Sequence, residues 1–201
     1  EYGLYKTTGC RPLSIEDAQK LAKEKLSPKR YIHESNVVDA AVRLAKRWGG
    51  NPQQAALAGW LHDIVKEESR GALLQWMEQD AIMAAATRQR PRPVWQGPCA
   101  TVFARHALDV KDEAVLSAVA CHTTGKVGMG RLDKILFVAD MISAERDYPG
   151  VEEMRRLAME NLDEAFIAIM QQSIDYVESR GRPLDEESVR ALAAMRRDAG
   201  V

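Results

Sequence analysis

The chain has 201 residues, the size of one domain or one large core. Its 28 basic and 29 acidic residues nearly cancel, so the charge does not favour binding to nucleic acid or to an anionic membrane. No apolar run approaches the ~20 residues that cross a bilayer, no signal peptide is visible, and three cysteines without metal-finger or disulfide-scaffold spacing indicate a reducing, cytoplasmic location.

The apolar residues recur at helical spacing along the chain, with no convincing alternating strand, so the predicted fold class is all-α. Ser14 followed by Asp17 is typical of a cap that opens the first helix. We therefore expect an N-terminal tail over residues 1–13 and a folded domain over residues 14–198. The chain begins at Glu1 without a methionine, as a fragment of a longer protein would.

The later predicted helices are apolar periodic segments between glycine, proline or polar breaks. In chain order they run from Ser27-Pro28 to Gly49-Gly50, from Asn51-Pro52 through Asp63, and over 72–77, 112–122, 132–142, 151–159, 162–179 and 186–197. Two segments are predicted as loops, the Pro-rich basic "RQRPRPVWQGP" at 88–98 and the Gly-rich "TTGKVGMG" at 123–130. Loops on a rigid helical scaffold commonly carry ligand contacts.

A candidate metal site begins with His62 and Asp63, at the end of an apolar helix. Neutral imidazole and carboxylate together suit iron, manganese or zinc. Adjacent helical residues point about 100° apart, so both reach one ion only at the helix edge, and more ligands are needed. His33, His122 and Asp140 are the candidates, since an acid inside the apolar "KILFVADMI" is costly unless paired or coordinated. The alternatives are a surface or capping histidine and an aspartate paired with an arginine.

Lys66 follows His62 by four residues and so shares its face if the helix continues. A cation beside a metal site is well placed to hold a phosphate oxygen. The alternative is a solvated lysine that balances the two glutamates after it. Cys121 precedes His122, but adjacent helical residues face apart, so we interpret Cys121 as a small core residue and not as a nucleophile.

The order His33, His62-Asp63, His122, Asp140 resembles the HD-domain metallophosphohydrolases. Within that superfamily the chain is similar to the YqeK family, bacterial proteins that hydrolyse diadenosine tetraphosphate symmetrically to two ADP. The similar segments are "RYIHESNVV" (30–38), "AALAGWLHDIVKE" (55–67), "CHTTGKVGMGRLDKILFVADMISAER" (121–146) and "LDEAFIAIMQQSIDYVESRGRPL" (162–184). The resemblance covers roughly residues 14–195, and "HTTG" followed by "LDKILFVAD" is its most specific part.

The resemblance implies an HD-domain helical bundle around a metal centre, commonly di-iron. The residues that match metal ligands are His33, His62, Asp63, His122 and Asp140. His122 matches a ligand of the second ion, and Asp63 is placed to bridge both. Lys66, Thr123 and Arg146 match positions near the substrate phosphates, and Asp63 and Lys66 are the candidate catalytic residues. The implied partner is a small nucleotide, and a homodimer is compatible with the sequence.

One position departs from the family. The family has a histidine just before a Gly-Pro pair, where this chain has Gln96 in "VWQGP". A glutamine offers only a neutral amide oxygen, so the second ion is expected to bind weakly. The next histidine, His106, is ~15 Å further along a regular helix, too far to replace it.

Three other functions remain open. A mononucleotide phosphohydrolase would have a similar metal site. A nucleotide sensor that binds but no longer hydrolyses is compatible with Gln96. A helical scaffold without metal or nucleotide is the remaining alternative.

Overall fold

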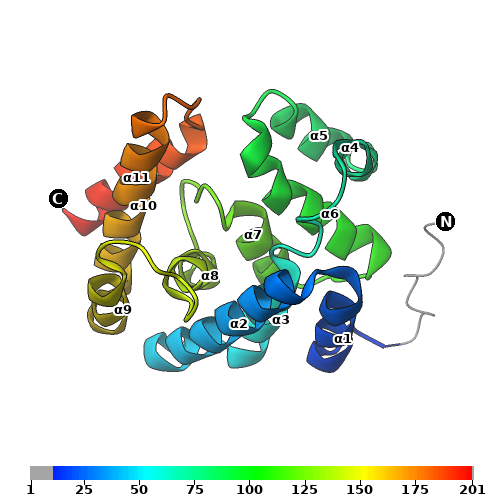
Figure 1. The fold of residues 1–201 in the computed structure, drawn as a ribbon, viewed down its shortest axis with the longest axis horizontal. Helices are drawn as coiled ribbons and strands as arrows, with labels where there is room; N and C mark the ends of the chain where they lie inside the picture. Colours follow the sequence, from blue (N-terminus) through cyan, green and yellow to red (C-terminus); the bar gives the residue numbers. More distant parts are fainter. Residues whose placement is uncertain (1–10, 201) are drawn as a thin grey trace.

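The computed structural model describes residues 11–200, which form helices joined by short connections (Figure 1). Over these residues there are eleven α-helices, one short 3-10 helix (η2) and no strand. In chain order they are α1 Ile15–Lys25, α2 Pro28–Trp48, α3 Pro52–Leu61, α4 Arg70–Met77, α5 Ala81–Thr87, η2 Arg92–Trp95, α6 Gln96–Ala107, α7 Glu113–Cys121, α8 Arg131–Ile142, α9 Val151–Glu160, α10 Leu162–Ser179 and α11 Glu186–Ala199. The all-α prediction is confirmed, while most of the expected tail lies outside the described residues.

The helix ends follow local capping chemistry. Ser14 accepts a hydrogen bond from the Asp17 backbone N–H and completes a capping box at the start of α1. Ser27 and Asn51 cap α2 and α3 in the same way. Gly49 ends α2 in the left-handed conformation, with φ 67°, which glycine adopts without steric cost. These predicted boundaries are confirmed.

Two predicted boundaries are wrong. The third helix was expected to run through Asp63, but α3 ends at Leu61, and residues 62–67 form consecutive turns. The helical-face argument for Lys66 therefore fails. The segment 88–98 is only partly a loop, since it contains η2 and the start of α6. Pro98 is the third residue of α6, where a helix has no internal acceptor for the missing N–H.

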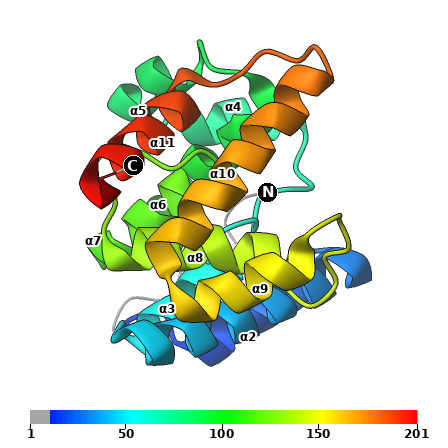
Figure 2. The same cartoon turned by 90° about the vertical axis from the view of Figure 1, so that its left-hand side faces the viewer.

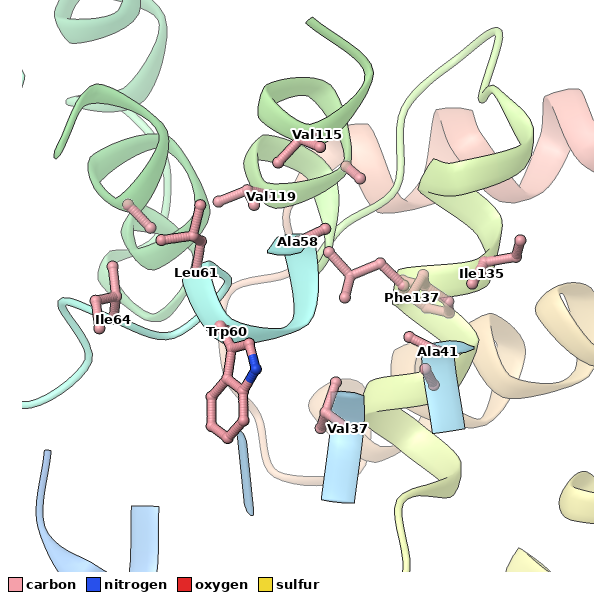
Figure 3. Packing of buried hydrophobic residues seen from close by; sticks show 14 of the residues in the cluster. Val37, Ala41, Ala58, Trp60, Leu61, Ile64, Val115, Val119, Ile135 and Phe137 are labelled. Atoms are coloured by element: carbon pink, nitrogen blue, oxygen red, sulfur yellow. The ribbon is translucent and has the colours of Figure 1, made fainter. Parts of the chain in front are cut away.

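Helices α2, α3, α7 and α8 form the centre of the bundle (Figure 1). Their apolar faces meet in the core shown in Figure 3, for example through Val37 of α2, Val119 of α7 and Phe137 of α8. Each fully buried aliphatic or aromatic side chain contributes ~1.5–3 kcal/mol. Gly59 allows the close crossing of α3 on α2, because a Cβ there would lie 2.7 Å from Val38 Cγ2.

Two outer groups of helices cover this centre. Helices α4–α6 lie on one side, and α9–α11 lie on the other, with α10 packed on α8, α9 and α11 (Figures 1 and 2). Among the described residues, no helix is both long and apolar enough to cross a membrane. The arrangement brings the ends of α3 and α7 beside the middle of α2 and the last turn of α8.

Candidate metal centre

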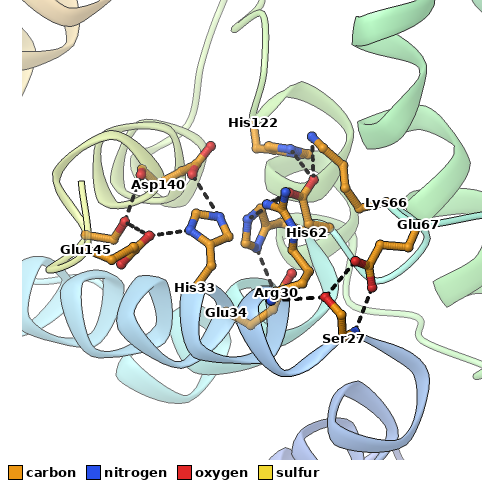
Figure 4. Close-up of polar contacts among 12 residues, drawn as sticks. Ser27, Arg30, His33, Glu34, His62, Lys66, Glu67, His122, Asp140 and Glu145 are labelled. Atoms are coloured by element: carbon orange, nitrogen blue, oxygen red, sulfur yellow. Dashed lines mark hydrogen bonds and ion pairs between the residues drawn. The ribbon is translucent and has the colours of Figure 1, made fainter. Parts of the chain in front are cut away.

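The five predicted metal ligands converge in the middle of the bundle. Figure 4 shows the side chains of His33, His62, His122 and Asp140 directed toward one another from α2, the end of α3, the end of α7 and α8. The His62 ring centroid lies 5.5 Å from that of His33 and 5.0 Å from that of His122. His122 Nε2 is 3.5 Å from Asp63 Oδ1, and His33 Nε2 is 3.2 Å from Asp140 Oδ1. The predicted cluster therefore exists as a geometric unit.

Two overlapping sets of donor atoms in this cluster are close enough to share an ion. One set is His33, His62 and Asp63, and the other is His62, His122 and Asp140. In each set the candidate donor atoms lie within 4.8 Å of one another. His62 is 0% exposed, which excludes the alternative of a surface histidine.

Each of the three imidazoles has its Nδ1 engaged. Those of His62 and His122 lie 2.7 and 2.8 Å from backbone carbonyls three residues earlier, and that of His33 contacts the Glu145 carboxylate. A carbonyl only accepts, so Nδ1 carries a proton in His62 and His122, and Nε2 is the nitrogen left to face the cluster. The Nε2 atoms of His33 and His62 are buried without a hydrogen-bond partner among residues 11–200. This is the pattern of metal-ligating histidines, so the donor set fits a divalent transition metal.

The electrostatics of the cluster favour a cation. Burial alone would lower the pKa of His62, but the negative charges of Glu34 and Asp63 raise it to about 10. Burial would raise the pKa of Asp63, yet the charge of His62 and the contact with His122 hold it well below its usual range. A buried imidazole with a raised pKa shows that negative potential accumulates here. A divalent ion would neutralise it.

Three basic side chains surround the acids. Arg30 Nη1 lies 3.0 Å from Asp63 Oδ2, and Lys66 Nζ lies 3.2 Å from Asp63 Oδ1. Arg146 pairs with Asp140 and also donates to its backbone carbonyl. Asp140 thus pairs with Arg146 and also lies beside His33. The arginine partner therefore does not exclude Asp140 as a metal ligand.

Lys66 is not the solvated surface lysine that the alternative interpretation expects. Its side chain is 33% exposed and pairs with the buried Asp63. The glutamates that it was expected to balance have other partners. Glu67 accepts hydrogen bonds from Ser27, and Glu68 pairs with Lys25.

Two acids of the site were not predicted. Glu34 is 0% exposed, and its Oε2 lies 3.2 Å from His62 Nδ1. Glu34 precedes the buried Val37 by three residues and so lies on the core face of α2. Helical periodicity in the sequence could therefore have identified it. Glu145 accepts from Asn36 Nδ2 and Ser143 Oγ at 2.7 Å each as it contacts His33. Glu145 lies after the end of α8, where no periodic pattern indicates its role.

A cavity of about 740 Å³ adjoins the cluster. His122 and Asp140 form part of its wall together with Thr123 and Arg146, two of the residues predicted near the substrate phosphates. The third, Lys66, is not among the lining residues. Other parts of the wall come from Pro91–Val94, from the segment between α8 and α9, from α10 and from the connection between α10 and α11. About half of the lining side chains are apolar, and polar groups among apolar ones are typical of small-ligand pockets.

Gln96 is the first residue of α6, and its Oε1 is buried without a hydrogen-bond partner in the part of the chain that the structure describes. Next to it, a Cβ on Gly97 would lie 2.5 Å from the Ala120 carbonyl oxygen, so this end of α6 packs tightly on the end of α7. His106 lies near the other end of the same unbroken helix and is exposed. The expectation that His106 does not replace Gln96 is therefore supported.

The structure also bears out the interpretation of Cys121 as a core residue. Cys121 is 5% exposed, and burial raises the pKa of its thiol to about 12. A thiol with that pKa is protonated at neutral pH and is a poor nucleophile.

Comparison with known proteins identifies the family. A family model described as "HD domain" matches residues 30–145. The symmetrical bis(5'-nucleosyl)-tetraphosphatase of Bacillus subtilis (strain 168) is 31% identical over 172 residues, 86% of this chain and 92% of the relative. The protein of the same name from Staphylococcus aureus (strain NCTC 8325 / PS 47) is 34% identical over 164 residues, 81% of this chain and 84% of the relative.

A solved structure supports the same assignment. The crystal structure of a predicted HD superfamily hydrolase involved in NAD metabolism, from Clostridium acetobutylicum, superposes with a TM-score of 0.82 at 26% sequence identity. The match covers 92% of this chain and 98% of the crystallised one. The chain therefore belongs to the HD-domain family and, within it, to the symmetrical bis(5'-nucleosyl)-tetraphosphatases.

Proposed function

We propose that the protein hydrolyses diadenosine tetraphosphate symmetrically to two ADP in a metal-dependent reaction. The observation that carries the proposal is the set of three buried imidazoles with engaged Nδ1 atoms beside Asp63 and Asp140, with His122 and Asp140 in the wall of a 740 Å³ cavity. The names of the relatives indicate the substrate. Symmetrical cleavage adds water to one central phosphorus, and the second ADP leaves on the bridging oxygen.

The proposed ligands of the metal are His33, His62, Asp63, His122 and Asp140. Iron is the expected metal, and manganese or zinc also suits these donors. When bound, such an ion supplies Lewis-acid polarisation of phosphate oxygens and a nucleophilic water at neutral pH. His62 belongs to both donor sets, but its Nε2 can bind only one ion. The Asp63 carboxylate has two oxygens, and Oδ1 lies 3.5 Å from His122, so we expect Asp63 to be the ligand that two ions would share.

The proposed phosphate contacts are Lys66, Thr123 and Arg146. Arg146 and Thr123 line the cavity beside His122, where a guanidinium and a hydroxyl can donate to phosphate oxygens. Lys66 holds Asp63 in place in this structure. We infer that its ammonium group shares its hydrogen bonds between Asp63 and the substrate.

Gln96 favours one second candidate, a nucleotide-binding sensor with reduced turnover. Its buried amide oxygen lacks a partner within the described residues. In the sequence, Gln96 matches the position of the family's histidine before the Gly-Pro pair. A neutral oxygen binds a transition metal more weakly than imidazole does. Slow hydrolysis with tight nucleotide binding would identify the sensor.

The main experiment combines elemental analysis of the purified protein with chromatography of its products. We expect a bound transition metal and two ADP per diadenosine tetraphosphate. Release of inorganic phosphate from AMP would instead identify a mononucleotide phosphohydrolase. Asp63→Ala should lose both metal and hydrolysis, whereas His106→Ala, at an exposed position, should lose neither. Full metal content and rate in Asp63→Ala would show that the ligand assignment is wrong.

Lys66→Ala should keep its metal and lose ~1–3 kcal/mol of substrate or transition-state binding, because a charge-assisted hydrogen bond is lost. The measurement is kcat and KM together with metal content. Lys134→Ala is a matched control, since Lys134 pairs with Asp163 at 2.6 Å and does not line the cavity. Unchanged kinetics in Lys66→Ala would show that Lys66 does not contact the substrate.

The proposed location is the cytoplasm, where the thiols of Cys99 and Cys121, both free in this structure, would stay reduced. The proposed partner is the nucleotide alone. A homodimer, compatible with the sequence, is tested by light scattering of the purified protein.

A further inference from the structure

The cavity is built from two parts of the chain. His122, Thr123 and Asp140 belong to the region matched by the HD-domain model, residues 30–145. The opposite wall comes from α10 and from residues 182–188, beyond that region. The C-terminal helices therefore complete a cavity whose metal side the HD domain supplies.

One guanidinium joins three segments of this wall. Arg90 Nε and Nη2 donate to the two carboxylate oxygens of Asp185 at 2.8 Å each. Arg90 Nη2 also lies 3.2 Å from Thr124 Oγ1. The Arg90 side chain is 21% exposed and that of Asp185 only 5%, so solvent weakens the bidentate pair little. We call Arg90, Thr124 and Asp185 the Arg90 cluster.

Each member of the Arg90 cluster is at, or next to, the cavity wall. Pro91 follows Arg90, Thr123 precedes Thr124, and Asp185 itself lines the cavity. Asp185 is also the N-cap of α11, where it accepts from the Glu187 backbone N–H at 3.1 Å. The Arg90 cluster thus ties the start of α11 to the segments that carry Pro91 and Thr123, and none of its three residues is a proposed metal ligand.

We propose that the Arg90 cluster positions the α10–α11 wall so that the cavity selects substrates carrying a nucleoside beyond the cleaved phosphates. This inference rests on the proposed function, since it assigns the far wall to the remote part of a dinucleotide. Remote groups raise specificity by contributing binding energy that a shorter substrate lacks. Arg92 and Arg182 on the same lining add positive charge suited to a polyphosphate.

Two conservative variants test the inference. Arg90→Lys keeps the charge but loses the bidentate geometry. Asp185→Asn keeps a good N-cap for α11 and removes only the charge that pairs with Arg90. In both variants we expect the KM for diadenosine tetraphosphate to rise about tenfold, because a displaced wall loses contacts with the remote nucleoside, and tenfold corresponds to about 1.4 kcal/mol of binding. The kcat, the metal content and inhibition by inorganic pyrophosphate, a probe of the metal side alone, should stay within twofold of wild type.

Arg105→Lys is the matched control. Arg105 makes a bidentate pair with Glu113 at 2.8 and 3.1 Å, and neither residue lines the cavity. The KM of the Arg105→Lys variant for diadenosine tetraphosphate should equal that of wild type. The inference is overturned if KM is unchanged in both test variants, if kcat falls as much as KM rises, or if Arg105→Lys has the same effect. Thermal melting of each variant confirms that it is folded.

Failure of the proposed function would look different. A wild-type protein that does not cleave diadenosine tetraphosphate would disprove the reaction, whatever the variants do. The role of the wall is then tested by isothermal titration calorimetry with the same dinucleotide. Tenfold weaker binding to Arg90→Lys and Asp185→Asn, but not to Arg105→Lys, supports the inference, and equal binding to all four proteins contradicts it.

Discussion

At the scale of single residues, the orientation of each imidazole depends on the partner of its Nδ1. Carbonyl oxygens hold His62 and His122, and a carboxylate holds His33. Each ring thus presents Nε2 to the same interior point. Glu34 is the residue whose charge bears most directly on this arrangement, since it is fully buried against His62.

We expect Glu34→Gln to weaken metal binding by about 10–100-fold, the effect of losing a partner beside a ligating imidazole. The carboxylate 3.2 Å from His62 Nδ1 makes the ring a stronger metal ligand through Nε2. The amide that replaces it is neutral and lacks this effect. Competition with a chelator measures the change. Because glutamine has nearly the same shape, the metal-free variant should keep the helical circular-dichroism spectrum of wild type. An unchanged metal affinity would reduce Glu34 to a packing residue.

Gln96 leads to a second prediction at this scale. The wild-type protein should hold one ion tightly and a second one weakly, because an amide oxygen stands in place of an imidazole. Gln96→His should raise the affinity of the second site, measured by metal titration. His106→Ala should change neither site, because His106 is exposed near the far end of α6. Two tight ions in wild type, one of them lost in His106→Ala, would show that the substitution was placed wrongly.

At the scale of elements, the ends of α3 and α7 explain why His62 and His122 are held so firmly. The last carbonyls of a helix have no intrahelical partner. A histidine placed just after the last helical residue can donate to one of them, as both do here. His62 itself keeps helical backbone angles, φ −61° and ψ −40°, so its ring lies over the last turn of α3, within reach of the Gly59 carbonyl.

Gly97→Ala should destabilise the protein by ~1–3 kcal/mol, because the added methyl group would lie 2.5 Å from the Ala120 carbonyl oxygen and 2.8 Å from that of Val119. The Val119 carbonyl holds His122, so metal content should fall too. Urea denaturation and elemental analysis test both effects. Gly71→Ala is the control, since the nearest atom to its Cβ is 3.8 Å away. Equal stability of the two variants would contradict this account of the contact between α6 and α7.

At the scale of the whole molecule, the apolar core and the metal centre contribute separately to stability. The core extends over nearly all the helices, and its buried side chains do not depend on an ion. Metal binding adds stability by mass action, because the converged ligands exist only in the folded state.

We expect the metal-free protein to keep its helical circular-dichroism spectrum and to melt at a lower temperature. An ion at 100 times its dissociation constant adds ~2.7 kcal/mol. For a chain of this size that corresponds to roughly 5–10 °C in Tm. Thermal melts with and without a chelator measure the shift. Loss of the helical spectrum on metal removal would show that the core does not hold the fold alone.

Features that depend on neighbouring residues could be predicted from the amino-acid sequence alone. Caps such as Ser14 with Asp17, the stop at Gly49 and the apolar periodicity predict the helices, because hydrogen bonds and side-chain spacing within a few residues decide them. The ligand set was predicted as well, because the segments that carry it resemble a known family. Glu34 could have been found from its place on the core face of α2.

Features that join distant segments of the chain could not be predicted, because they arise only when the helices pack together. Leu61, not Asp63, ends α3, although no glycine or proline in the sequence marks that end. Glu145 meets His33 across 112 residues, and Arg90 meets Asp185 across 95. No local pattern encodes such pairs, since each exists only when the helices have packed. The cavity between the metal ligands and the α10–α11 wall exists for the same reason.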